Sequence, residues 1–101
     1  MSLNRQLEEE TVLDGIRYVR VPSEPRFAVS SCGRVMGRTG RILKLRSNGK
    51  YKTVAVSTPR SANYYVHRLV AEVFLGPSEL CVNHIDGDRD NNDVSNLEYV
   101  T

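Results

Sequence analysis

The sequence has no tryptophan, only two cysteines and no long apolar run. None of its hydrophobic stretches approaches the roughly 18 to 20 residues that a membrane-spanning helix needs, and no charged segment followed by an apolar one marks a secretory leader. We therefore expect one cytoplasmic domain, because 101 residues are enough for one modest core and too few for two.

Other absences narrow the chemistry. Cys32 and Cys81 lack the C-x-x-C spacing of a zinc knuckle, so we expect two buried free thiols, with a disulfide between them as the alternative. No Gly-x-Ser-x-Gly elbow indicates a serine hydrolase, and no Gly-x-x-x-x-Gly-Lys loop indicates a nucleotide cofactor. Lipidation motifs and basic amphipathic helices are also missing, so no membrane partner is expected.

Acidic residues are absent from residues 25–71. This stretch holds ten basic residues: Arg26, Arg34, Arg38, Arg41, Lys44, Arg46, Lys50, Lys52, Arg60 and Arg68. Residues 1–24 carry three basic and five acidic residues and residues 72–101 carry one and seven, so charges of −2, +10 and −6 sum to the net +2. This segregation is typical of a polyanion-binding surface beside a cation-binding site, and a surface of mixed charge is the alternative.

Short β-branched and alternating stretches predict a β-rich first half. Strands are expected over residues 16–21, 27–30, 33–36 and 50–57. Residues 22–25, which include two prolines, read as a loop, and residues 31–33 as a turn. Asn48-Gly49 predicts a hairpin turn, because this pair tolerates the positive φ that such turns need.

One amphipathic helix is predicted over residues 66–75. Val66, Leu69, Val70, Val73 and Phe74 follow the spacing of a buried stripe, and Gly76-Pro77 ends it. His67 lies beside this stripe, and a structural role at the helix start competes with a role at a DNA surface.

The last twenty residues carry the candidate chemistry. His84 sits in a short apolar run, residues 82–85, and a histidine can act as a general base near neutral pH. If residues 82–85 and 96–100 pair as antiparallel strands, the Asn96 amide returns toward the imidazole. The Asp-rich loop between them starts like a calcium loop, but Asn91 replaces its glycine and Leu97 its final glutamate. A solvated turn is the alternative, since Asp, Asn and Gly favour turns. The family resemblance described next implies a third interpretation, a loop that links the strands and is shaped by Asn91 or Asn92.

The run VNHIDGDRDNN…NLEYVT resembles the HNH endonucleases of phages and mobile introns. The resemblance implies a ββα finger around one divalent metal ion, Mg²⁺ or Mn²⁺, with Zn²⁺ as a further possibility. It implies that His84 is the general base, that Asn96 fixes the tautomer of the His84 ring, and that Asn83 is a metal ligand, with Asp86 as a substitute ligand. The third motif residue, on the final helix, would fall beyond Thr101.

A second resemblance covers the basic segment. The run FAVSSCGRVMGRTGRILKLR is similar to the small modular DNA-binding segment at the N-terminus of many such nucleases, and VHRLVAEVFL to the segment before their HNH core. These similarities imply double-stranded DNA as the partner, with a homodimer possible. The DNA-binding residues expected are Arg34, Arg38, Arg41, Lys44, Arg46, Lys50, Lys52, His67 and Arg68.

We therefore expect an α+β fold in which a basic antiparallel sheet and one amphipathic helix lead into a truncated ββα-metal finger. Residues 1–10 form a polar leader, residues 11–60 the DNA-binding segment and residues 61–101 the HNH-like core without its final helix. The expected function is metal-dependent DNA cleavage or nicking. The alternative is a DNA-binding module that no longer cuts, and a purely structural interaction domain is a third, more distant one.

Overall fold

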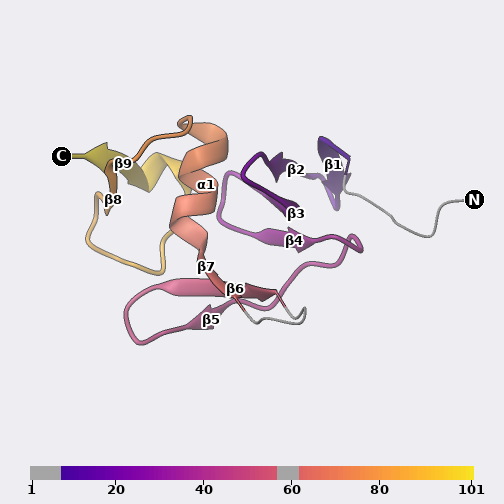
Figure 1. The fold of residues 1–101 in the computed structure, drawn as a ribbon, viewed down its shortest axis with the longest axis horizontal. Helices are drawn as coiled ribbons and strands as arrows, with labels where there is room; N and C mark the ends of the chain where they lie inside the picture. The colour runs from indigo at the N-terminus through magenta and orange to yellow at the C-terminus, as the bar shows by residue number, and fades with distance from the viewer. Residues whose placement is uncertain (1–7, 57–61) are drawn as a thin grey trace, which may run out of the picture.

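A computed structural model describes residues 8–56 and 62–101, which form an α+β fold. Within these residues the strands make three antiparallel sheets of four, three and two strands, and helix α1 lies between them (Figure 1). No helix of the described residues is long and apolar enough to cross a membrane. The single sheet expected for the basic segment is divided into a four-stranded and a three-stranded sheet, with Arg26 in a strand of the first and Arg46 and Lys52 in strands of the second.

The four-stranded sheet is built from successive antiparallel neighbours. Its strands are β1 (Glu10–Leu13), β2 (Ile16–Val21), β3 (Glu24–Val29) and β4 (Val35–Gly37). The predicted limits of β2 are confirmed. The polar leader was drawn too long and β1 was missed, although Asp14-Gly15, with φ of 52° and 78°, is a hairpin signal. The loop expected over residues 22–25 is shorter, since β3 already begins at Glu24.

The three-stranded sheet carries the hairpin that the sequence predicted. It consists of β5 (Arg46–Ser47), β6 (Lys52–Val56) and β7 (Ala62–Tyr65), in that order. Because β6 pairs with β7 from Thr53↔Tyr65 to Val56↔Ala62, the expected boundary between residues 60 and 61 falls inside one sheet. The polar loop predicted around residues 58–63 lies in part outside the described residues, as does Arg60.

Helix α1 (Val66–Phe74) joins the three sheets into one core. The predicted stripe is confirmed, since Val66, Leu69 and Val70 are buried. They pack with residues from every sheet: Val21, Phe27, Val29, Val35, Val54 and Leu97. Removing apolar surface of this extent from water is the main stabilising contribution in a domain of this size.

The C-terminal pair of strands forms as the sequence predicted. β8 (Cys81–His84) and β9 (Leu97–Val100) are antiparallel, and the 3-10 turn η1 (Val94–Asn96) leads into β9. Their register places Asn83 opposite Glu98 and His84 opposite Leu97. Cys32 and Cys81 are free, but both are exposed, which corrects the expectation of buried thiols. Cys32 lies in the turn between β3 and β4, and Cys81 is the first residue of β8.

Candidate active site

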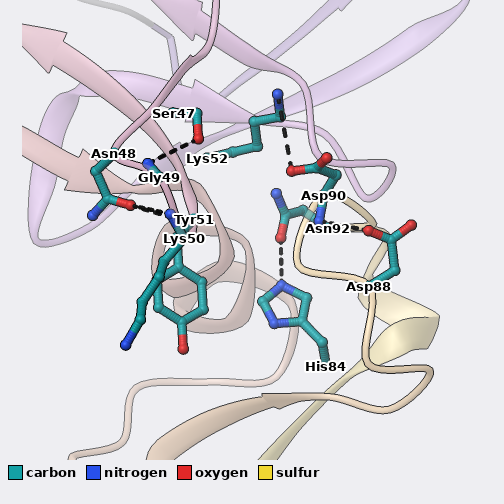
Figure 2. Close-up of polar contacts among 10 residues, drawn as sticks. All are labelled: Ser47, Asn48, Gly49, Lys50, Tyr51, Lys52, His84, Asp88, Asp90 and Asn92. Carbon is teal, nitrogen blue, oxygen red and sulfur yellow. Dashed lines mark hydrogen bonds and ion pairs between the residues drawn. The ribbon is translucent and has the colours of Figure 1, made fainter.

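His84 is the last residue of β8 and only 7% exposed. Its Nε2 lies 2.7 Å from Oδ1 of Asn92, in the loop between β8 and η1 (Figure 2). An amide oxygen only accepts hydrogen bonds, so Nε2–H must donate. In the neutral ring the lone pair is therefore on Nδ1, which makes Nδ1 the nitrogen that can take up a proton.

Asn92, and not Asn96, is the amide that holds the His84 ring. Asn96 accepts a hydrogen bond from the Asp86 backbone N–H and donates to Oδ1 of Asp86 and to the Asn91 carbonyl, each at 2.9 Å. The strand pairing does bring residue 96 back to the base, because the Ile85 N–H donates to the Asn96 carbonyl at 2.8 Å. The expectation failed on side-chain direction, since the Asn96 amide turns into the loop.

Asp86 organises this loop. Its carboxylate accepts hydrogen bonds from the Asp88 N–H, the Asn96 amide and the Asn91 amide. The pKa of Asp86 is lowered first by the bond from Asn91, then by those from Asp88 and Asn96. Three of its roughly four lone-pair sites are thus taken, which leaves little of the carboxylate for a metal ion.

Asn83, the other expected metal ligand, lies on β8. Its side-chain N–H donates to Oε1 of Glu98 across the strand pair at 3.0 Å, so its amide oxygen is turned from that bond. Oxygen donors of this kind suit a hard cation such as Mg²⁺ or Mn²⁺. Zn²⁺ prefers histidine and cysteine, and within residues 8–56 and 62–101 no group of three His, Cys, Asp or Glu side chains could hold a metal.

His84 belongs to a cluster of four rings. The centroid of Tyr51 lies 4.8 Å from that of His67 and 6.0 Å from that of His84, and the two histidines are 5.1 Å apart. Tyr65 completes the group at 5.5 Å from Tyr51 and 5.3 Å from His67. We refer to Tyr51, Tyr65, His67 and His84 as the ring cluster. Sequence reasoning missed it, because its members come from β7, α1, β8 and the hairpin before β6.

His67 is buried in this cluster, with 6% exposure, so it is not on the surface where a DNA phosphate would meet it. Burial, followed by the charges of His84 and Arg68, lowers the pKa of His67 to about 4. His67 is therefore neutral at pH 7. Of the two interpretations of the sequence, the structural one fits the geometry.

Gly33 lies close to Asn92, the residue that is hydrogen-bonded to His84. Its φ is +92°, and a Cβ added there would lie 3.0 Å from the Asn92 Cβ and 3.1 Å from the Asn92 carbonyl oxygen. Beside it, the Val94 N–H donates to the Ser31 carbonyl at 2.8 Å. The turn at residues 31–33 thus supports the loop that carries Asn92. The glycine in the V-S-S-C-G-R-V run was the signal for such a close approach.

Six of the expected DNA-binding residues have exposed side chains: Arg34, Arg38, Arg41, Lys44, Arg46 and Lys50. Lys52 is partly buried and lies 3.9 Å from the Asp90 carboxylate (Figure 2). Arg68 does not fit the expectation, because its guanidinium donates to the Leu80 carbonyl at 2.6 Å and the Ser78 carbonyl at 3.0 Å. That side chain anchors the segment between α1 and β8.

Comparison with known proteins agrees with this geometry. Residues 64–101, which include both His84 and Asn92, match the model of the HNH endonuclease family. Over 55 residues the chain is 47% identical to YosQ of Bacillus subtilis strain 168, named as an SPbeta prophage-derived HNH homing endonuclease, with 50% of this chain and 32% of YosQ covered. Over 83 residues it is 35% identical to DNA endonuclease I-HmuI of Bacillus phage SP01, with 77% and 48% covered.

A solved structure gives the same relationship in three dimensions. The chain aligns with the HNH homing endonuclease I-HmuI, in a structure described as showing DNA binding and cleavage, with a TM-score of 0.71 and 33% identity. This alignment covers 83% of the chain and 52% of I-HmuI. The chain thus spans about half the length of I-HmuI and about a third of YosQ.

Proposed function

We propose that this chain is a member of the HNH endonuclease family and that it cleaves or nicks double-stranded DNA by metal-dependent hydrolysis of a phosphodiester bond. The observation that carries the proposal is His84, a nearly buried imidazole fixed by Asn92 within the segment that matches the family. The name of one relative, DNA endonuclease, and the DNA-bound cleavage described for its structure support DNA as the substrate.

The general base in this proposal is Nδ1 of His84. It removes a proton from the attacking water, and the imidazole then carries a positive charge. The hydrogen bond from Nε2–H to the Asn92 oxygen becomes charge-assisted at that moment and so favours the protonated ring. A positioned base of this type contributes about 10²- to 10⁴-fold to a reaction rate.

A divalent ion, when bound, supplies charge neutralisation at the scissile phosphate. In this chain Asn83 would hold Mg²⁺ or Mn²⁺ through its amide oxygen, and Asp86 through what remains of its carboxylate. Mg²⁺ sites commonly use one or two protein ligands, with water and phosphate oxygens completing the shell, so a small protein share is compatible with this ion.

The exposed cations supply the grip on DNA in this proposal. Arg34, Arg38 and Arg41 follow β3 and border β4, while Lys44, Arg46 and Lys50 lead into and out of β5. Side chains of this kind neutralise phosphates and release counterions, so affinity falls steeply as salt rises. Such contacts position the duplex and do not read its sequence.

Incubation with supercoiled plasmid tests the proposal. We expect conversion to open circle in Mg²⁺ or Mn²⁺, no conversion in chelator, and a loss of at least about 10²-fold in His84→Ala. Circular dichroism and thermal melting verify that the variant is folded. Retention of DNA on a gel without any conversion by the wild type would favour the alternative function, a binding module that does not cut.

A further inference from the structure

Tyr51 lies in the turn that joins β5 to β6, within residues 46–56, which we call the basic hairpin. The Asn48 side-chain oxygen accepts hydrogen bonds from the backbone N–H groups of Lys50 and Tyr51, at 3.0 and 2.9 Å. The Asn48 N–H in turn donates to the Tyr51 carbonyl at 3.2 Å. This turn sets the backbone of Tyr51 just before β6 begins, so the direction of its side chain is determined locally.

From that place the ring reaches the candidate base. Tyr51 and His84 are stacked at an interplanar angle of 23°, with the Tyr51 ring beside the imidazole in Figure 2. The His67 ring lies beside both, and its plane is tilted at 41° to that of Tyr51 and at 63° to that of His84. The His84 imidazole is therefore contacted by the Asn92 amide at the edge of the ring and by the Tyr51 and His67 rings beside it.

Core packing does not account for Tyr51. The residue is only partly buried and does not belong to either hydrophobic cluster of the described residues or to the side chains packed against them. Tyr51 also contacts the loop that follows His84, because the Arg89 guanidinium of that loop lies 5.4 Å from the Tyr51 ring centroid. Lys52, next to Tyr51, meets Asp90 of the same loop. The hairpin and the loop thus meet around this ring.

We propose that Tyr51 is a positioning residue, whose ring holds the plane of the His84 imidazole and ties it to the hairpin that carries Lys50 and Lys52. The inference rests on the proposed function of His84. Asn92 fixes one ring nitrogen but permits rotation about that hydrogen bond, whereas a stacked ring opposes this rotation. The same short hairpin then presents phosphate-binding cations and aligns the base, so DNA engaged by the hairpin meets a base already oriented.

Three variants test the role of Tyr51. Tyr51→Phe keeps the ring and Tyr51→Ala removes it. Tyr65→Ala removes a 44% exposed ring of the cluster that contacts Tyr51 and His67. For plasmid nicking we expect Tyr51→Ala to lower kcat by about tenfold or more with KM nearly unchanged, because misaligned catalytic groups lose rate and not binding. Tyr51→Phe and Tyr65→Ala should stay within about threefold of wild type on the same grounds.

Imidazole nitrogen NMR supplies a readout that does not need cleavage. Long-range ¹H–¹⁵N spectra, assigned with His84→Ala, should show sharp signals of the His84 ring nitrogens in the wild type and in Tyr51→Phe, and signals broadened by motion of the ring in Tyr51→Ala. If the wild type never cleaves but these spectra behave as expected, the proposed function fails and the positioning role stands. Unchanged spectra or unchanged kcat in Tyr51→Ala, or equal losses in Tyr51→Ala and Tyr65→Ala, would overturn the proposal.

Discussion

The acidic loop of residues 85–96 and the basic hairpin of residues 46–56 use their charges differently. In the loop, Asp86, Asp88 and Asp93 each accept a backbone N–H within the loop. In the hairpin, the order comes from strand pairing and the Asn48 turn, and Arg46 and Lys50 remain exposed. The carboxylates of Asp86, Asp88 and Asp93 therefore stabilise the loop itself, whereas Arg46 and Lys50 of the hairpin are exposed to a partner.

The charge of a segment does not by itself indicate what the segment binds. The acidic end of the chain looks like a cation site by composition, yet its carboxylates are already hydrogen-bonded. The two regions contribute to one site where they touch, through Lys52 and Asp90 and through Arg89 and Tyr51. Substitutions in each region test whether its charges stabilise the fold or bind a partner.

Asn96→Ala should have the largest effect, because it removes three hydrogen bonds from the loop at once. We expect the free energy of unfolding to fall by on the order of 2–3 kcal/mol in chemical denaturation, with nicking lost. The matched change in the hairpin, Asn48→Ala, removes two hydrogen bonds at an exposed turn and should cost about 1 kcal/mol. Equal losses in the two variants would contradict the contrast between loop and hairpin.

Gly33→Ala should disturb the base from outside the loop. A Cβ would press on Asn92 and strain a residue at φ +92°, so nicking should fall about tenfold or more through a displaced His84. Gly40→Ala is the control, because Gly40 has a similar φ of +87° but nothing within 4 Å of the added Cβ. It should cost about 1 kcal/mol in stability and leave nicking intact. Equal nicking by both variants would show that Asn92 tolerates the push.

The neutral His67 predicts a loss of stability in mild acid. Its pKa is lowered from 6.5 to about 4, so between these values the unfolded chain binds a proton that the folded chain does not. The free energy of unfolding should therefore fall as the pH goes from about 6.5 toward 4, by on the order of 2 kcal/mol.

Urea denaturation at pH 7, 6 and 5 measures this slope, and His67→Phe should flatten it. Glu24 interferes only at lower pH, because the hydrogen bond from Arg26 holds the pKa of Glu24 at about 2, and its contribution is lost between about 4.5 and 2. A wild-type slope that persists in His67→Phe would assign the effect to another group.

Substitution of single exposed cations, Lys44 or Arg46, should have the smallest effects on stability and DNA affinity. Lys44→Ala and Arg46→Ala change exposed side chains, so stability should stay within about 0.5 kcal/mol. Each should lower the slope of log affinity against log salt by about one, as expected for one lost phosphate contact. Arg68→Ala is the contrasting variant: it should lower stability, since its guanidinium anchors two carbonyls, and leave the salt slope unchanged. Slopes identical to wild type in Lys44→Ala and Arg46→Ala would remove both from the DNA surface.

The sequence predicted the elements whose signals are periodic. The limits of β2, the stripe of α1 and the pairing of β8 with β9 all follow from local patterns of apolar residues. It did not predict which asparagine meets His84, because the direction of a loop side chain depends on hydrogen bonds across the whole loop. The burial of His67 and the stacking of Tyr51 were equally hidden, since they arise from packing between elements distant in the chain.

Strand β7 runs directly into α1 at Tyr65 and Val66, and this continuity limits how the chain can be recombined. A chimera joined between residues 60 and 61 would contain β6 without β7, its native pairing strand. It would also separate Val54 from the α1 residues in its core cluster. A graft joined in the turn at residues 38–40 keeps the three-stranded sheet, the helix and the base in a single cassette. In engineering terms, the exchangeable unit includes the hairpin, and swapping specificity at the more obvious boundary would produce an unpaired edge prone to aggregation.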